Sequence, residues 1–205
     1  MGSLVGHIGE ETPTYEVLSK TSEYEIRRYG PRLEVCTSME EGVDEGAPFR
    51  RLAGYIGVLS KPQNESKTAQ KPETIAMTAP VVMKPKPEPI AMTAPVVMEA
   101  GKDSALMSFI LPSKYTLETA PKPTNPKVFL RKVEGKIEAV STFSGRYRMK
   151  NCGNKKEELF TALDRDKIQY EKSNWVLMGY NPPWTLPPLR KNEIAVPVVK
   201  FSGKD

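Results

Sequence analysis

The segment Tyr180-Asn-Pro-Pro-Trp-Thr-Leu-Pro-Pro-Leu-Arg-Lys-Asn-Glu-Ile-Ala-Val-Pro-Val198 has the plan of a strand end, a rigid loop and a second strand. Four prolines between residues 182 and 188 fix φ near about −65° and cannot donate to a sheet ladder, so they predict a stiff loop. Trp184 and Leu186 lie within this loop. Trp184 is interpreted in two ways, as a wall for a ligand or as packing that closes one end of a β core.

The composition predicts a folded protein with a hydrophobic core, and the order of elements described below places it in the α+β class. The chain has 205 residues, of which 39% are hydrophobic, and this fits one domain with a core rather than a disordered chain. No apolar run reaches the roughly 18 residues of a spanning helix, so no membrane association is expected. The first ten residues lack a basic region and an apolar region, and Cys36 and Cys152 form no CxxC pair. Both observations favour a cytoplasmic, reducing location.

The charge pattern gives no sign of nucleic-acid binding. Lysine and arginine total 30 against 25 acidic residues, for a net charge of +5, and the basic residues are spread along the chain. The adjacent basic residues Arg27-Arg28, Arg50-Arg51 and Lys155-Lys156 are only pairs. We interpret this as a charge that keeps the protein in solution.

Hydrophobic alternation predicts strands on both sides of two turn-like breaks. Residues 1–13 are expected to be an N-terminal arm, followed by a short strand at Tyr15–Leu18. Two hairpins are then predicted, one around Gly30-Pro31 and one around Glu134-Gly135. Their strands are expected at Tyr24–Tyr29 and Leu33–Met39, and at Val128–Val133 and Ile137–Phe143.

Two amphipathic helices are predicted. Residues 44–56 begin with Asp44 as a possible cap, and Gly57 can end the helix. The second helix is expected to start at Asn154, which opens a capping-box-like sequence. The apolar faces of the two helices consist of Phe49, Leu52, Ala53 and Ile56, and of Leu159, Phe160 and Leu163.

The most unusual feature is a repeat. Ile75-Ala-Met-Thr-Ala-Pro-Val-Val-Met83 returns unchanged as residues 90–98, and Lys71-Pro-Glu73 returns as residues 86–88. The period of 15 residues is too short for a solenoid unit, so a local duplication is the simplest interpretation. One copy is expected to form the strand and the other an inserted loop or hairpin. Continuity with the apolar run Leu106–Leu111 favours the second copy as the strand.

The order of predicted elements is similar in residues 14–111 and 127–201. Each half contains a hairpin, a helix and two strands, and each carries a proline element beside a strand. Two such βαββ-like halves could close their sheets into a distorted antiparallel β-barrel with a helix on each flank. We therefore expect one domain over residues 14–205, with a ligand cleft between the halves.

Seven segments spread over nearly the whole chain carry a family resemblance. They are Glu11–Tyr15, Tyr24–Tyr29, Ile75–Val81, Phe109–Tyr115, Phe143–Gly145, Tyr180–Pro188 and Asn192-Glu193. Together they resemble the SOUL haem-binding family, in particular its plant-type cytosolic branch. The resemblance implies a distorted barrel of two βαββ-type halves that binds haem or a related porphyrin. The implied site is a shallow apolar groove on the first helix, closed by the proline loop.

On this basis we expect a monomeric cytosolic carrier or buffer that binds haem, another tetrapyrrole or a flat hydrophobic small molecule without a covalent bond. No catalytic constellation is recognisable, because His7 is the only histidine, so no metal site is expected and an enzyme is disfavoured. The alternatives are an enzyme acting on a tetrapyrrole or another hydrophobic molecule in the same groove, and an interaction module without a ligand. The predicted ligand-binding residues are Phe49, Arg50, Leu52, Tyr55, Ile56, Met77, Met92, Tyr180, Trp184 and Arg190.

Overall fold

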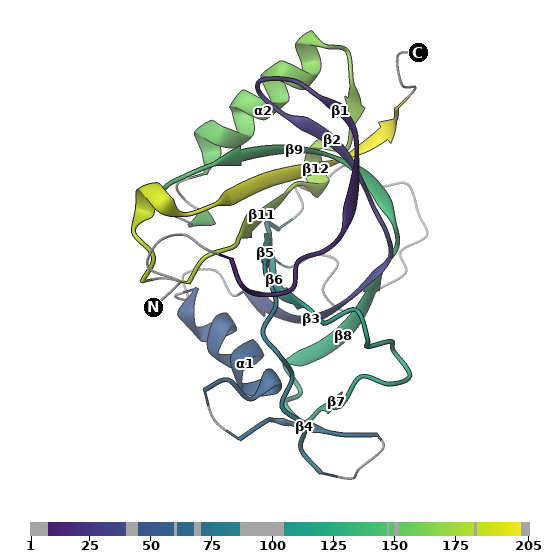
Figure 1. Ribbon diagram of the computed structural model, residues 1–205, viewed down its shortest axis with the longest axis vertical. Coiled ribbons are helices and arrows are strands. Elements are labelled where there is room, and N and C mark those ends of the chain that lie inside the picture. Colours follow the sequence, from purple (N-terminus) through teal and green to yellow (C-terminus); the bar gives the residue numbers. More distant parts are fainter. Residues whose placement is uncertain are drawn as a thin grey trace.

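The computed structural model describes residues 8–39, 45–59, 61–67, 71–86, 105–146, 148–149, 152–182 and 184–201. Two α-helices and a mostly antiparallel sheet make up this part of the chain, which confirms the α+β class (Figure 1). The helices are α1 (Gly46–Ile56) and α2 (Gly153–Arg165), and short 3-10 helices cover Lys172–Asn174 and Pro187–Leu189. The strands are β1 (Tyr15–Lys20), β2 (Glu25–Tyr29), β3 (Arg32–Met39), β4 (Asn64–Glu65), β5 (Val81–Lys84), β6 (Ala105–Ile110), β7 (Lys122–Pro123), β8 (Val128–Val133), β9 (Lys136–Phe143), β10 (Gln169–Tyr170), β11 (Val176–Gly179) and β12 (Asn192–Lys200).

The large sheet has the strand order β1-β2-β9-β12-β11-β5-β6-β3-β8, with β10 added beside β12. Every pair in this order is antiparallel. Within the described residues β1 and β8 are the two ends of an open path, so the closed barrel expected from the sequence is not confirmed. Strands β4 and β7 form a separate small sheet.

The two predicted hairpins are wrong. Strand β2 pairs with β9 and not with β3, while β3 pairs with β8. Tyr29 lies opposite Lys136 and Arg32 lies opposite Val133, so one antiparallel register continues across both breaks. Gly30-Pro31 and Glu134-Gly135 are therefore facing corners of one bent ribbon. They approach so closely that a Cβ on Gly135 would lie 2.9 Å from the carbonyl oxygen of Tyr29.

The helices form where the periodicity predicts them, but their caps differ. Helix α1 begins at Gly46 with Glu45 in the cap position, and Asp44 lies outside the described residues. It ends at Gly57, whose φ of 81° is left-handed, as the sequence predicted. Helix α2 has Cys152 in the cap position, so Asn154 lies inside the helix instead of capping it. Neither cap residue makes a side-chain cap hydrogen bond.

The first copy of the repeat supplies β5. Val81–Lys84 pairs with β6 on one edge and with β11 on the other. This corrects the expectation that the second copy is the strand, and residues 90–98 lie outside the described part of the chain. The sequence could not decide between identical segments, and continuity with the following strand was a poor guide.

Alternating side chains of the sheet separate two buried environments. The larger hydrophobic core contains the apolar faces of α1 and α2 together with residues such as Val35, Phe109 and Ile194. The opposite side of the sheet holds a smaller cluster that includes Val82, Ile110 and Ala195. This second side, which we call the inner face, also carries the buried charged side chains described below.

Candidate functional site

Four segments enter or leave the sheet at the same end of the neighbouring strands β5, β11, β12 and β9, and we call this end the edge. Val81 at the start of β5 pairs with Gly179 at the end of β11, and Phe143 at the end of β9 pairs with Asn192 at the start of β12. Helix α1 is connected to this edge because the Met149 amide donates to the Glu45 carboxylate at 3.2 Å. The Gly145 amide donates to the carbonyl of Pro187 at 2.9 Å, so segment 143–149 contacts both the proline loop and the start of α1.

The proline loop, residues 181–191, exposes its large apolar side chains. Trp184 is 63% exposed, Leu186 is 58% exposed and Leu189 is 45% exposed. Backbone hydrogen bonds fix its turns, because Thr185 donates to Pro182 and Leu189 donates to Leu186. The loop thus presents apolar surface on a frame that does not depend on those side chains, and Trp184 does not close the β core.

Helix α1 contributes less surface than its periodicity suggested. Leu52, Tyr55 and Ile56 are at most 1% exposed, and the Tyr55 hydroxyl donates to the carbonyl of Pro121 at 2.8 Å. Phe49 is half-buried and meets Phe109 edge to face, with 5.4 Å between the ring centroids. Of the predicted helix residues, only Phe49 and Arg50 have appreciable exposure, and Arg50 is exposed.

Other half-buried apolar side chains pack against the same large core as Phe49. They include Met77, which the sequence predicted, and Phe143 and Met149, which it did not assign to the site. Phe143 was visible in the sequence only as part of a family motif, and no local pattern marked Met149. Met92 was predicted to line the site and lies outside the described residues.

Tyr180 anchors the start of the proline loop in a buried ionic network. Its hydroxyl donates to Glu193 at 2.5 Å, and Arg27 donates to the same carboxylate at 3.0 Å. Lys191 lies 3.1 Å from Glu193, and Arg27 also contacts Glu25 at 2.7 Å. Burial, and then the charge of Glu193, raises the pKa of Tyr180, so this phenol stays protonated. The structure therefore places Tyr180 in a structural network.

Arg190 lies within the loop that it was predicted to serve. It is half-buried, and its Nε donates to the carbonyl of Thr185 at 2.7 Å. This contact ties the end of the loop back to its middle.

A second ionic cluster lies on the inner face, on neighbouring strands. Glu34 accepts from Arg32 Nε at 2.9 Å, from Arg131 at 2.7 Å and from Ser108 at 3.0 Å. Burial alone would raise the pKa of Glu34, but the positive charges of Arg32 and Arg131 outweigh it and lower that pKa. Lys136 pairs with Glu138 at 2.7 Å in the same region. The buried charges of the inner face therefore compensate one another through ion pairs.

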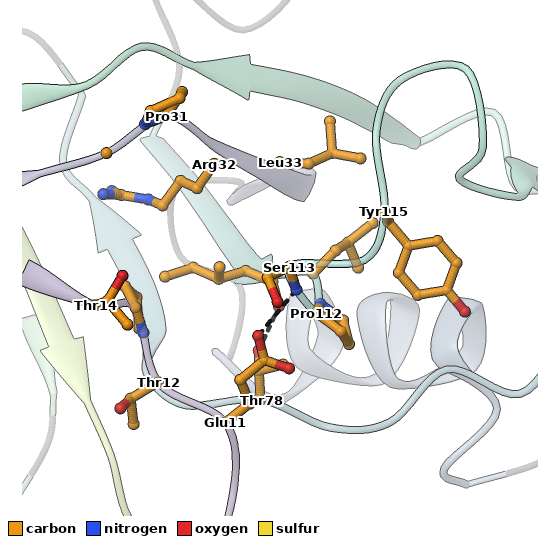
Figure 2. A pocket seen from close by; sticks show the side chains of 14 residues that line it. Glu11, Thr12, Thr14, Pro31, Arg32, Leu33, Thr78, Pro112, Ser113 and Tyr115 are labelled. Atoms are coloured by element: carbon orange, nitrogen blue, oxygen red, sulfur yellow. Dashed lines mark hydrogen bonds between the residues drawn. The ribbon is translucent and has the colours of Figure 1, made fainter.

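A cavity of about 250 Å³ lies beside the corner at Gly30-Pro31 (Figure 2). Residues 11–14 line one side of it, and Ile110 to Ser113 line another. The Glu11 carboxylate accepts from the Ser113 amide at 2.9 Å, which fastens the N-terminal segment over the cavity (Figure 2). The predicted ligand-binding residues are not among those that line this cavity.

Reactive and metal-binding chemistry finds little support in the described residues. No group of three or more histidine, cysteine, aspartate or glutamate side chains in this part of the chain is placed to hold a metal ion. Cys152, in the cap position of α2, is 2% exposed, and burial raises the pKa of its thiol. In the described chain, the helices are too short and too polar to cross a membrane.

Comparison with known proteins identifies the family. The model of the family described as SOUL heme-binding protein matches residues 10–197, which cover nearly the whole chain. The protein therefore belongs to the SOUL heme-binding family. Comparison with curated protein sequences gives no match.

Solved structures resemble the fold at low sequence identity. An uncharacterized conserved protein from Listeria innocua has a TM-score of 0.54 at 13% identity, with 88% of this chain and 94% of that one covered. A protein described as a hydrolase from Listeria innocua has a TM-score of 0.51 at 14% identity, with 88% and 93% covered. The C-terminal domain of EcmrR has a TM-score of 0.51 at 10% identity, with 91% and 99% covered. These similarities establish the fold alone.

Proposed function

We propose that the protein binds haem or a related tetrapyrrole at the edge formed by the proline loop, α1 and segment 143–149, and that it serves as a cytosolic carrier or buffer. The observation that carries the proposal is the exposure of Trp184, Leu186 and Leu189 on a rigid loop. Membership of a haem-binding family supports a tetrapyrrole as the ligand. Exposed apolar groups gathered in one short segment are typical of a binding surface.

The apolar side chains at this edge suit a flat ligand. Trp184 and Leu186 offer exposed surface, and the half-buried Phe49 and Met77 offer a second apolar surface near the same edge. Covering apolar surface contributes about 25 cal/mol per Å², so a macrocycle can bind mainly by burial. Because the loop is already ordered by its own hydrogen bonds, little conformational entropy is lost when a ligand covers it.

Basic side chains at the same edge would meet the propionates. Arg50 on α1 and Arg148 on segment 143–149 are both exposed. Arg190 and Lys191 contact Thr185 and Glu193, so they contribute positive charge while they also hold the loop. A guanidinium is well suited to pair with a carboxylate through two hydrogen bonds.

No histidine occurs among the described residues, and His7 is the only one in the sequence. Binding by burial does not need an iron ligand, so we expect the affinities for haem and for iron-free protoporphyrin to be similar. Parallel titrations of wild type and His7→Ala test this expectation. A tenfold or greater loss for haem alone in His7→Ala, which corresponds to about 1.4 kcal/mol, would identify His7 as an axial ligand.

The site itself is tested by alanine substitutions of Trp184 and Leu186, with an exposed leucine elsewhere as the control. Trp184→Ala and Leu186→Ala should each weaken porphyrin binding by about tenfold or more, with little change in thermal stability. Leu117→Ala is the matched control, because Leu117 is 41% exposed outside this edge. If Trp184→Ala and Leu186→Ala bind porphyrin as tightly as Leu117→Ala, the result would contradict the proposed site. A chemically altered porphyrin after incubation would contradict the carrier role.

A further inference from the structure

The two copies of the repeat are nearly interchangeable. Residues 71–84 and 86–99 are identical at every aligned position except two. Thr74 corresponds to Pro89, and Lys84 corresponds to Glu99. The duplication therefore includes the β5 core residues together with the segment that leads into the strand.

The contacts that the first copy makes can all be supplied by the second copy. Glu73 accepts from the Tyr115 hydroxyl at 2.6 Å, and Ile75 donates its amide to Ile56 at 3.0 Å. Val82 and Met83 are buried between β6 and β11. Each of these positions has the same residue type 15 places further along the sequence. Thr74 is exposed, so proline at that position loses no buried contact.

The position that differs most in charge lies on the inner face. Lys84 is half-buried and makes no ion pair within the described residues. Burial, and then the positive charges of Arg131 and Lys136, lowers the pKa of Lys84. A carboxylate at the same point would be attracted by Arg131 and Lys136. Glu171 and Glu34, which raise the pKa of Lys84, would repel that carboxylate. The position therefore has charged neighbours of both signs, and neither Lys84 nor Glu99 meets charges of its own sign alone.

The connections on both sides can accommodate the exchange. Strand β5 ends at Lys84 and its partner β6 begins at Ala105, so residues 85–104 connect the two strands. With the second copy in the sheet, this connection shortens by 15 residues and the one before β5 lengthens by the same number. The cost of loop closure changes by only about 0.6 kcal/mol per doubling of length, and the two changes oppose one another.

We propose that the β5 position between β6 and β11 accepts either copy of the repeat, so that the protein exchanges between two folded conformers. The occupant is residues 75–84 in one conformer and residues 90–99 in the other. The identity of the two segments and the contacts of β5 that both can make carry this inference, and it is independent of the proposed function.

Matched aspartate substitutions in the full chain test the exchange. Val82→Asp places a charge at a position that is 3% exposed, and Val97→Asp is the same change in the second copy. Each single variant should unfold cooperatively with a Tm within about 5 °C of wild type, because the intact copy occupies the sheet. The double variant should lose more than about 10 °C or fail to unfold cooperatively. A Val82→Asp variant that is as unstable as the double variant would overturn the proposal.

Charge reversal and hydrogen exchange provide independent tests. Glu99→Lys added to Val82→Asp gives the second copy the lysine that the first copy has at this position, so the Tm should stay within about 5 °C of that of Val82→Asp. In the wild type, hydrogen exchange measured by mass spectrometry should find partial protection in both copies, which are distinguished by their flanking residues. Protection of residues 81–83 with unprotected exchange at residues 96–98 would show that only the first copy enters the sheet, and the proposal would fail.

Discussion

Two proline elements lie at the same edge of the sheet and differ in what covers them. Thr78, Ala79 and Pro80 precede β5 and are buried, with the Thr78 hydroxyl donating to the carbonyl of Ile110. The proline loop follows β11 and exposes Trp184 and its leucines. The first element has its side chains committed to packing, whereas the second keeps its shape through backbone hydrogen bonds. Of the two elements, only the second keeps large apolar side chains exposed in the part of the chain that the structure describes.

This difference explains why a proline-rich sequence alone does not identify a site. Both elements combine prolines with apolar neighbours, and both stiffen the chain where a strand begins or ends. What separates them is whether another strand supplies a surface to cover them. Ile110 of β6 lies under the first element, whereas Trp184, Leu186 and Leu189 of the proline loop stay exposed among the described residues. The following predictions test this contrast, beginning with the largest effect.

Removing the support of the buried element should destabilise the fold most. Ile110→Ala should cost about 2–5 kcal/mol, because Ile110 is 6% exposed and packs with Ala79 and Val82. Leu186→Ala removes side-chain carbons from the exposed element and should change stability by about 0.5 kcal/mol or less. Urea unfolding of both variants measures the contrast. Equal losses would mean that the proline loop is a structural element of the core.

Acid should weaken the strand beside the buried element. Glu34 lies opposite Ile110, and its folded pKa is lowered, so its contribution to stability is present above its unfolded pKa of about 4.3. That contribution is lost as the pH falls through the folded pKa. Glu34→Gln should lose about 2–4 kcal/mol at pH 7, since Arg32 and the partly exposed Arg131 lose their ionic partner. Its stability should also depend less on pH than that of wild type between about pH 5 and 2.

The control for acid unfolding is Glu65→Gln, because Glu65 is exposed. Urea midpoints at pH 7 and at about pH 3.5 separate the two variants. If Glu34→Gln loses as much stability between pH 7 and about pH 3.5 as the wild type does, Glu34 is not responsible for the loss of stability in acid.

Substitution of Tyr180, which anchors the proline loop, should have an intermediate effect on stability. Tyr180→Phe removes the donor to buried Glu193 and should cost about 1.5–3 kcal/mol. Because the Tyr180 side chain is only 8% exposed, the porphyrin affinity of the folded variant should change by less than about threefold. A large loss of affinity at unchanged stability would place Tyr180 against the ligand, as the sequence suggested.

Deleting the second repeat copy should also have only a small effect on stability. Deletion of residues 85–99 keeps all of β5 and leaves a short connection between Lys84 and Leu106, which already pair. Stability should change by about 1 kcal/mol or less. Differential scanning calorimetry measures the change. A collapse of the thermal midpoint would show that both copies are required for the folded state.

Local patterns predicted the elements better than their partners. Alternation identified the strands around Gly30-Pro31 and Glu134-Gly135, but the breaks are corners because each strand pairs with one about a hundred residues away. Nothing in a short window specifies such a partner. The periodicity of α1 likewise identified Leu52 and Ile56 as one apolar face, and the sheet then buried that face. Trp184 was identified correctly as a feature of the loop, and its exposure depended on tertiary structure.

The bent ribbon formed by β2-β3 and β8-β9 sets an order of events during synthesis on the ribosome. Strand β2 lies between β1 and β9 in the sheet. The amino-terminal part of the sheet therefore stays incomplete until residues near 140 have emerged. Pairings between such distant residues form slowly, because a long loop must close before any contact is gained. The emerging chain therefore exposes unpaired strand edges for much of its synthesis, a state in which association with other chains competes with folding. Part of that exposure outlasts completion of the ribbon, because β9 and β5 gain their remaining neighbours only when β12 and β11 have emerged.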